Sequence, residues 1–424
     1  MKLYPNILFL LLILFISCDS DNSPEPIEPD PVVILPDEVE VYEQDKIENS
    51  LVLAVINGGT ESFLIDKKGE KIFEWVFEDN LGNDLELLPD GRLLGIFKVE
   101  NPEFSFGGFG GIIKILNIDG SVDWEYSYFS SNYIAHHDVE MLPNGNVIFM
   151  AWEKIEPAEA QALGINVDYN LYPETLIEVN PDTDQIVWEW HSWDHLVQDF
   201  DSNLPTFGQI NENPQLINHT YNLTENGDIM HANGIDYDKE NDVIFLSINY
   251  YSEVWVIDHS TTTVESSSHS GGNYGKGGDL IYRFGNPEAY NNINGTRLFY
   301  NNHFPNYLNE DEPGYGNVLI FMNGSNIEQS TIYELKMPND FNLEIDEDNE
   351  PEIVWSFTDD LLFHGRISGA VRLKNGNTLI CEGDYGFWEV TPNKEVVWKY
   401  NGNGNFWRAY IYLPTESAIL NLGL

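Results

Sequence analysis

The stretch Thr391–Tyr400 (TPNKEVVWKY) carries a pattern that repeats along the chain. A turn containing Asp or Asn is followed by a small or polar linker, an apolar residue, an aromatic residue, and another apolar or aromatic residue. The other copies are KKGEKIFEWVF at Trp75, IDGSVDWEYSY at Trp124, NPDTDQIVWEW at Trp188, GGDLIYRFGNP at Tyr282 and NEPEIVWSF at Trp355. Short segments of this kind, separated by turns, predict an all-β chain.

A second phrase lies upstream of several of these segments. Its copies are LPDGRLLGIF from Leu88, LPNGNVIFMAW from Leu142, PGYGNVLIFMNG from Pro313 and LKNGNTLICEG from Leu373. We expect the strand after each Gly-containing turn to pair, as a hairpin, with a neighbour that ends in the aromatic residue. Hairpins that cannot bury their own faces indicate a β-propeller, and the six aromatic segments predict a six-bladed β-propeller with long inter-strand loops.

The alternative architecture is a pair of β-sandwiches, which would have a similar density of strands. The constant content of the repeat favours the propeller, because a chain of two domains would be divided by a Pro/Gly-rich linker that this sequence lacks. The longest insert runs from Trp190 to Asp279. We expect it to lie over one face and to shape a pocket there, because function concentrates in the loops of a rigid scaffold.

The charge of the chain excludes one large class of partners. There are 20 Lys and Arg against 70 Asp and Glu in 424 residues, for a formal net charge of −50. Such a surface repels phosphate backbones and has no basic stripe, so we expect no nucleic-acid partner. The aromatic content of 13% indicates a large folded core.

The N-terminal residues predict export. Residues 1–18 contain an apolar run that is too short to span a membrane, followed by Cys18 in the sequence FISC, which resembles a lipoprotein signal with a lipidated cysteine. Residues 19–45 are rich in Pro and acidic residues and predict a tether, which leaves 46–424 as the propeller. We therefore expect a lipoprotein of the cell envelope, on its periplasmic face or at the cell surface, whose membrane contact is the lipid alone.

The sequence indicates neither a disulfide nor a metal site. Cys381 is the one cysteine besides Cys18, so we expect it to be a small buried hydrophobic residue. His191 and His195 have the i, i+4 spacing that can hold zinc on a helix, but a third ligand is not evident and no metalloprotease Glu follows His191. We therefore expect no metal and no cofactor.

Several histidines lie in unusual phrases, and these are candidates for a site. His136 and His137 are adjacent in YIAHHDVEM, His231 lies in IMHANGIDYD, and His303 in FYNNHFPNYL. Residues on the inner strands of different blades meet at the axis of a propeller, so these distant positions can converge.

The phrases around these histidines resemble those of the bacterial arylsulfate sulfotransferases. The matching stretches include HHDVEMLPNGNVIFMAWE, VWEWHSWDHLVQD, HANGIDYDKENDVIFLS, SEVWVIDHSTT, HSGGNYGKGGDLIYRFGNP and ISGAVRLKNGNTLICEG. They cover most of the chain in the order found in the family. The resemblance implies a six-bladed propeller that transfers a sulfuryl group from an aryl sulfate donor to a phenolic acceptor by a ping-pong mechanism, without a nucleotide or cofactor.

The resemblance also implies roles for individual residues. His303 falls at the histidine that forms the covalent sulfohistidine. His231 and Asn233 match the HxN pair that binds the sulfate, and His137, or its neighbour His136, matches the histidine of the HHD phrase. A neutral imidazole can attack sulfur, while an imidazolium stabilises sulfate oxygens and protonates the leaving phenolate.

Two positions depart from the family pattern. Asn249 stands where the family commonly has Arg, and it offers an anion a neutral amide in place of a charged fork. Arg366 precedes Ile-Ser-Gly, where the family tends to have an uncharged residue or His. We expect Arg366 to supply the missing cation from another blade, so that both residues belong to the substrate-binding set.

Two other functions remain open on the same scaffold. The first is a catalytically silent propeller at the cell surface that binds sulfated or carbohydrate ligands, because a fold alone does not settle a function. The second is a sulfatase-like hydrolase in which water is the acceptor. Acceleration of donor consumption by added phenol distinguishes the transferase from the hydrolase.

Overall fold

The computed structural model describes residues 35–424, and the all-β prediction is confirmed for them. Cys18 and the predicted signal lie outside the described residues. The helices are few and short: α1 (Pro157–Ala162), α2 (Thr263–Ser266) and α3 (Ser417–Asn421), with 3-10 turns η1 (Ser192–Asp194), η2 (Ile210–Glu212) and η3 (Pro287–Tyr290). Within residues 35–424, no helix is long and apolar enough to cross a membrane.

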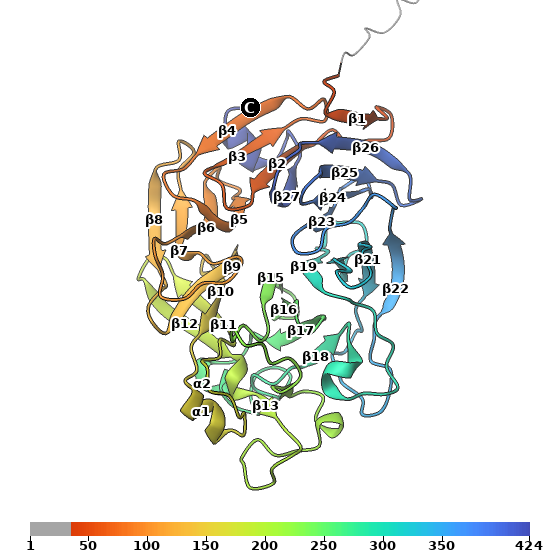
Figure 1. Cartoon of the computed structure of the whole chain (residues 1–424). Helices are drawn as coiled ribbons and strands as arrows, with labels where there is room; N and C mark the ends of the chain where they lie inside the picture. The colour runs from red at the N-terminus through yellow and green to blue at the C-terminus, as the bar shows by residue number, and fades with distance from the viewer. Residues whose placement is uncertain (1–34) are drawn as a thin grey trace, which may run out of the picture. The chain divides into compact units, whose positions relative to one another are not determined.

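The strands form sheets arranged around a common centre, in a β-propeller-like arrangement (Figure 1). The three four-stranded sheets are β27 (Phe406–Tyr412) with β2 (Leu51–Ile56), β3 (Glu61–Ile65) and β4 (Lys71–Val76); β15 (Ala232–Asp238), β16 (Val243–Ile248), β17 (Glu253–Asp258) and β18 (Tyr282–Phe284); and β19 (Asn302–Tyr307), β20 (Asn317–Met322), β21 (Thr331–Lys336) and β22 (Glu352–Phe357).

The five-stranded sheet contains β23 (Gly369–Arg372), β24 (Thr378–Glu382), β25 (Gly386–Val390), β26 (Val396–Asn401) and β1 (Val39–Tyr42). The eight-stranded sheet contains β5 (Leu81–Leu87), β6 (Leu93–Lys98), β7 (Gly111–Leu116), β8 (Val122–Ser127), β9 (Tyr133–Met141), β10 (Val147–Glu153), β11 (Glu174–Asn180) and β12 (Gln185–His191). A small parallel pair is formed by β13 (Leu196–Val197) and β14 (Ile217–Asn218).

The blade count differs from the prediction of six. Four blade-sized sheets are separate, whereas β5–β8 and β9–β12 share the eight-stranded sheet. The two halves of that sheet are antiparallel meanders joined by one parallel pair, Asn83 with His137. Both residues have positive φ, 140° and 57°, so the two inner strands bend out of their own ladders here and their backbones meet.

Both ends of the described chain close the ring. Strand β27 pairs with β2, for example Leu51 with Tyr412, so the last strand is the innermost strand of the first sheet. Strand β1 pairs with β26 at the outer edge of the last sheet. Because β1 lies within 19–45, the ordered fold begins earlier than the predicted boundary at residue 46; Val39 is buried in that sheet.

The repeated aromatic residues share one structural position. Trp75, Trp124, Trp188, Tyr282, Trp355 and Trp398 lie respectively on β4, β8, β12, β18, β22 and β26, each the fourth strand of a four-stranded group. The Gly-containing phrases form the turn between the first and second strands of a group, as at Leu88 and Leu142. The predicted pairing of these two phrases is wrong, because the third strand of each group lies between them.

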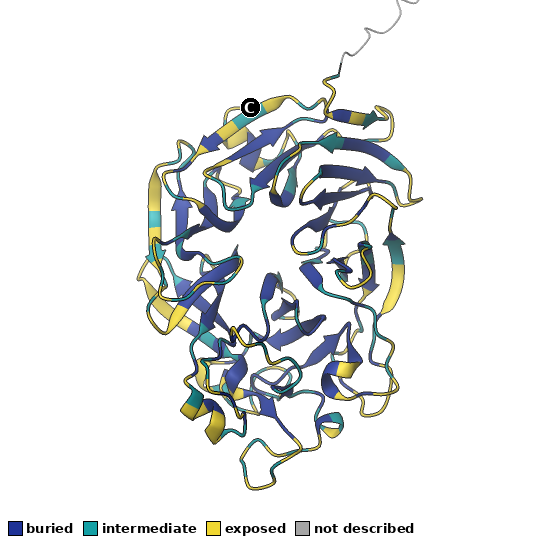
Figure 2. Cartoon of the chain, in the orientation of Figure 1, coloured by how far each residue is buried: buried dark blue, intermediate teal, exposed yellow. Residues whose placement is uncertain are grey.

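The core lies between neighbouring sheets. Figure 2 shows that inner strands are buried and several outermost strands are exposed along much of their length. Large side chains such as Trp190 and Trp255 fill the space between the sheets that contain β12 and β17. Each such side chain contributes about 2–3 kcal/mol when it leaves water. Cys381 is buried and unpaired within the described chain, as predicted.

The sequence predicted a single long insert from Trp190 to Asp279, and this prediction is wrong. This stretch contains β15, β16 and β17, which are three strands of a sheet, and only the connections before β15 and after β17 are long loops. The part of this stretch that reaches the pocket described next consists of His231, Asn249 and Tyr250.

Candidate active site

A pocket of about 440 Å³ opens over the first residues of the inner strands. Its wall combines residues on β5, β9 and β27 with loops from the other sheets. The lining residues are Asn57, Asn83, Gly107, Gly108, His137, His231, Asn249, Tyr250, Asn301, Ser325, His364, Gly365, Arg366, Ile367, Asn405 and Trp407. Three histidines and five asparagines make this wall polar.

Backbone irregularities aim several of these side chains into the pocket. His137, His231 and Asn301 have φ of 57°, 51° and 63°, a region that residues other than Gly rarely adopt. The ladders of β9, β15 and β19 shift register close to these residues. Bulges of this kind re-aim side chains at the rims of sheets, so the inner strands are distorted where the pocket forms.

A hydrogen-bonded relay ends at His137. Glu174 Oε2 lies 2.8 Å from His136 Nε2, and His136 Nδ1 lies 2.8 Å from His137 Nδ1. Because both Nδ1 atoms are engaged with each other, His137 Nε2 is the nitrogen left for the pocket. If His136 Nε2 carries the proton and donates to Glu174, then His137 Nδ1 donates to His136, and Nε2 of a neutral His137 is an acceptor. If Glu174 carries that proton instead, both donors reverse, and His137 Nε2 is a donor.

Burial governs the protonation of this relay. It lowers the pKa of His136 and His137 well below the usual value, and nearby His231 lowers both further. Burial also raises the pKa of Glu174, although the backbone N–H of Ala232 donates to Oε1 at 2.7 Å and opposes the shift. His137 is therefore a neutral imidazole near pH 7.

His231 has the opposite character. Its Nδ1 lies 2.5 Å from Asp228 Oδ2, and its ring stacks on Tyr250 with centroids 4.8 Å apart. Burial alone would lower the pKa of His231, but the Asp228 carboxylate outweighs it and the net shift is upward. The ring centroids of His231 and His137 are 4.9 Å apart, so an imidazolium and a neutral imidazole face the same space.

His303 lies behind the wall of the pocket and is almost completely buried. Its Nδ1 is 2.5 Å from the carbonyl oxygen of Ser368, which can only accept, so Nδ1 carries the proton. Nε2 therefore has the lone pair, and it has no hydrogen-bond partner among residues 35–424. Burial and the charge of Arg408 hold the pKa of His303 well below its usual value. Its ring contacts Trp407 edge to face at 4.5 Å, and Trp407 lines the pocket.

The two asparagines expected to bind sulfate are engaged with the backbone beside His303. Asn233 and Asn249 both donate their side-chain amide to the carbonyl oxygen of Asn302, at 2.8 and 3.0 Å. Asn249 Oδ1 in turn accepts from Asn301 at 3.0 Å. Asn249 lines the pocket, whereas Asn233 is buried beneath it, so both position the start of β19.

Arg366 is an exposed cation on the pocket rim. It makes no ion pair with any residue of the described chain. His364 shapes the turn that presents it, because His364 Nδ1 accepts the backbone N–H groups of Arg366 and Ile367 at 3.2 and 3.0 Å. The guanidinium is thus available to an anion.

A buried cation supports the floor of the site. Arg408 lies 2.8 Å from Asp138 Oδ2 and 3.4 Å from Asp84 Oδ1, and it donates to the carbonyl oxygen of Asn233 at 2.7 Å. Its charge is compensated by these two carboxylates, so it stabilises the inner strands and tunes His303 rather than facing the pocket.

The structure brings together most of the residues predicted from the sequence. His137, His231, Asn249 and Arg366 line the pocket. His136, Asn233 and His303 lie behind its wall and contact the lining residues or the backbone that carries them.

The sequence does not single out the partners of these residues. Glu174, Asp228 and Arg408 are acidic or basic residues in a chain with many of them, and nothing in their own phrases distinguishes them. The nearest signal was Asp228, three residues before His231 in DIMHANG.

Taken together, the fold and this site define a β-propeller protein with a histidine-lined pocket over its inner strands. The sequence matches the family described as Arylsulfotransferase (ASST) over residues 38–405, so the chain belongs to that family and the resemblance seen in the motifs is confirmed. Membership supports a sulfotransferase function and implies aryl sulfates and phenols as substrates.

Solved structures resemble the chain at low sequence identity. A protein of unknown function from Bacteroides caccae shares 13% identity, with a TM-score of 0.50 over 86% of this chain and 99% of that chain. The WD40 domain of coronin from Toxoplasma gondii shares 7% identity, with a TM-score of 0.42 over 88% of this chain and 73% of that chain. At 13% identity the first likeness concerns the fold alone. None of the curated proteins matches the chain.

Proposed function

We propose that the chain transfers a sulfuryl group from an aryl sulfate to a phenol in two steps through a sulfohistidine at His303. The observation that carries this proposal is the state of His303: Nδ1 is fixed by the Ser368 carbonyl oxygen, and Nε2 is a buried lone pair with no partner in the described chain. An imidazole held neutral in this tautomer is a nucleophile.

In the first step, His303 Nε2 attacks the sulfur atom. The N–S bond forms as the bond from sulfur to the aryl oxygen breaks, and the leaving phenolate takes a proton from His231. In the second step, the oxygen of a phenol attacks the same sulfur, the N–S bond breaks, and His231 recovers the proton. His231 suits both roles, because Asp228 keeps it protonated and it lines the pocket.

The sulfate oxygens would be held by a mixed set of donors. His231 and the rim residue Arg366 supply positive charge, and the side-chain amides of Asn57, Asn83 and Asn405 add neutral donors from other sheets. In this proposal Arg366 takes the place of the cation that Asn249 lacks. Donors fixed before the substrate arrives stabilise charge as it develops in the transition state.

Trp407 controls access in this mechanism. His303 contacts the pocket through Trp407, whose indole packs edge to face on the imidazole. We propose that the indole moves aside when the donor binds, since Nε2 must come within about 3–3.5 Å of the sulfur atom.

The test follows release of 4-nitrophenol from 4-nitrophenyl sulfate by the purified protein, with and without phenol. We expect phenol to accelerate release and, without phenol, a burst of about one equivalent per chain as the sulfohistidine accumulates. His303→Ala removes the burst and lowers turnover by about 10³-fold or more, whereas His137→Ala lowers turnover but keeps the burst.

Other outcomes would contradict the proposal in different ways. A burst that survives in His303→Ala and disappears in His137→Ala would move the covalent step to His137. Release that phenol does not accelerate would indicate a hydrolase. A folded protein that releases no 4-nitrophenol would favour the binding-only propeller, for which the engagement of Asn249 with Asn301 and Asn302 is the supporting observation.

A further inference from the structure

A second cluster of ligand-type side chains lies away from the pocket, among the connections around α2. His195 Nδ1 and His269 Nδ1 approach the same oxygen, Asp279 Oδ1, at 2.8 and 2.7 Å. The three ligand atoms lie within 4.8 Å of one another. His195 and Asp279 are buried, while the side chain of His269 is 63% exposed.

The hydrogen-bond partners of His195 fix which of its nitrogens is free. Nε2 lies 2.9 Å from the carbonyl oxygen of Ser266, which only accepts, so Nε2 carries the proton. In a neutral imidazole Nδ1 then presents a lone pair to the Asp279 carboxylate, which is also a lone-pair donor. Two lone pairs at this distance need a cation between them, either a second proton or a metal ion.

The surroundings hold this arrangement rigidly. The ring of His195 lies parallel to Trp190, with centroids 5.8 Å apart, and the Trp190 indole donates to the carbonyl oxygen of Gly278 at 2.7 Å. A Cβ on Gly278 would lie 2.6 Å from His195 Nε2, so this close approach needs the glycine. A histidine whose other nitrogen donates to a backbone carbonyl is the usual form of a metal ligand.

We propose that His195, His269 and Asp279 form a zinc site. Two imidazole nitrogens and one carboxylate oxygen suit Zn²⁺, which binds them at about 2.0–2.2 Å with tetrahedral geometry. Neighbouring ligand atoms around such an ion lie about 3.3 Å apart. When the ion binds, the distances from His195 Nδ1 and His269 Nδ1 to Asp279 Oδ1 would therefore each lengthen by about half an ångström. Water completes the coordination on the side of the exposed His269, and the acidic surface raises the local concentration of cations.

This site differs from the zinc pair that the sequence raised and set aside. His191 ends β12 and its ring lies between Glu153 and Glu189, at 3.0 and 3.1 Å, so it does not share a face with His195. The partners of His195 instead come from a connection more than seventy residues further along the chain, which a search for local spacing does not detect.

The position of the cluster gives the metal a structural role. His195 follows η1 in the connection after β12, whereas His269 and Asp279 lie in the connection between β17 and β18. One ion would therefore tie a loop of the eight-stranded sheet to a loop of the next sheet. The proposal is independent of sulfuryl transfer.

The test measures zinc on the untagged full-length protein. Titration calorimetry should give about one equivalent, X-ray absorption at the zinc edge should show imidazole ligands, and zinc should raise the melting temperature. His269→Ala, chosen because His269 is exposed and its loss leaves the fold intact, should weaken binding at least about tenfold and abolish the thermal shift. Asp279→Asn should act in the same direction.

His191→Ala is the matched control, because it removes the neighbouring histidine of the same sequence phrase and should leave zinc binding unchanged. The proposal is overturned if the folded wild-type protein binds no zinc at about 100 µM, or if His269→Ala binds zinc as tightly as the wild type.

Discussion

Two histidines of the site, His137 and His303, have the opposite pKa shift to the histidines that lie between two carboxylates away from the pocket, such as His191. The pKa of His137 and that of His303 are held well below the usual value by burial. His191, at the end of β12, is also largely buried, yet Glu153 and Glu189 overcome the effect of burial and raise its pKa to about 10. Two flanking carboxylates therefore outweigh burial at His191, whereas the single contact with Glu174 does not outweigh it at His136, whose pKa stays well below the usual value.

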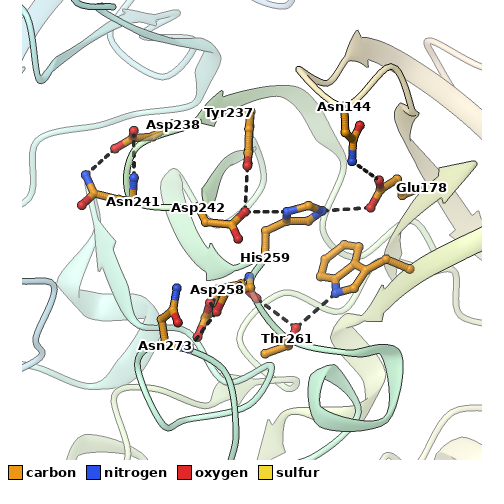
Figure 3. A network of polar contacts seen from close by, with 12 residues as sticks. Asn144, Glu178, Tyr237, Asp238, Asn241, Asp242, Asp258, His259, Thr261 and Asn273 are labelled. Carbon is orange, nitrogen blue, oxygen red and sulfur yellow. Dashed lines mark hydrogen bonds and ion pairs between the residues drawn. The ribbon is translucent and has the colours of Figure 1, made fainter.

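Figure 3 shows the outer arrangement at His259. Its Nδ1 lies 2.8 Å from Asp242 Oδ1 and its Nε2 lies 3.0 Å from Glu178 Oε2, so one ring joins two sheets. The Tyr237 hydroxyl donates to the same Asp242 oxygen, and Asn144 donates to Glu178. Burial lowers the pKa of His259, but the two carboxylates more than reverse this and the net shift is upward.

The pocket differs from the outer sites because it combines histidines with opposite pKa shifts. His231 lies beside the neutral His137; burial lowers its pKa, but the contacting Asp228 carboxylate, aided by Glu174, reverses this and raises the pKa above the usual value. The pocket thus combines one imidazolium with neutral imidazoles, which acid–base and nucleophilic chemistry both need. Outside the pocket, doubly paired histidines are structural ion pairs.

Among the variants that test this comparison, we expect the largest effect from crowding the neutral imidazole of His137. A Cβ on Gly108 would lie 2.2 Å from His137 Nε2, so Gly108→Ala displaces the ring and should lower kcat/KM about 100-fold. Gly145→Ala is the matched control: Gly145 has the same φ of 84°, and a Cβ there meets nothing within 4 Å in the described chain. Ala at this positive φ should cost each variant about 1–2 kcal/mol of unfolding free energy, to which the clash with His137 adds in Gly108→Ala alone. Equal activity in both variants would contradict the role of His137.

The second prediction removes the charge that distinguishes His231. Asp228→Asn takes away the anion at Nδ1, so the pKa of His231 falls and the alkaline limb of the kcat/KM profile moves to lower pH. We expect roughly a tenfold loss of activity at neutral pH. Asp242→Asn changes the corresponding partner of His259 and should leave the profile where it is. If both variants gave the wild-type profile, Asp228 would not govern catalysis.

The smallest effect concerns stability at the outer strands. The pKa of His191 rises from the unfolded value of about 6.5 to about 10 in the folded state, so the folded chain holds a proton that the unfolded chain releases. The resulting stability is complete below pH 6.5 and disappears as pH rises through 10. His191→Gln should therefore cost about 1 kcal/mol near pH 6 and almost nothing above pH 10, as measured by urea unfolding. A difference that stays constant with pH would show that the ion pairs contribute nothing.

The sequence predicted the repeated strands because each copy carries its own local signal. The aromatic residue follows a turn and lies on the fourth strand of its group, as Trp75 and Trp398 do. The sequence did not predict that two blades share one sheet. That joining depends on one backbone contact between Asn83 and His137 at positive φ, which the side chains alone do not encode.

The candidate site was predicted through its histidines and not through their partners. Glu174 and Asp228 acquire their roles only when β11 and the loop before β15 come next to β9. In a chain with 70 acidic residues, the carboxylate that matters is defined by the fold. Asn249 likewise was expected to face the substrate, while its amide holds the backbone next to His303.

The closure of the ring by β27 also sets the order of events when the protein is made. The partners of this strand in β2 leave the ribosome about 350 residues earlier, and at typical synthesis rates they wait tens of seconds for it. Trp407 and Arg408, which shape the pocket, lie on that late strand. Wherever the chain folds, the edge of β2 therefore stays unpaired and the pocket lacks Trp407 until β27 is in place.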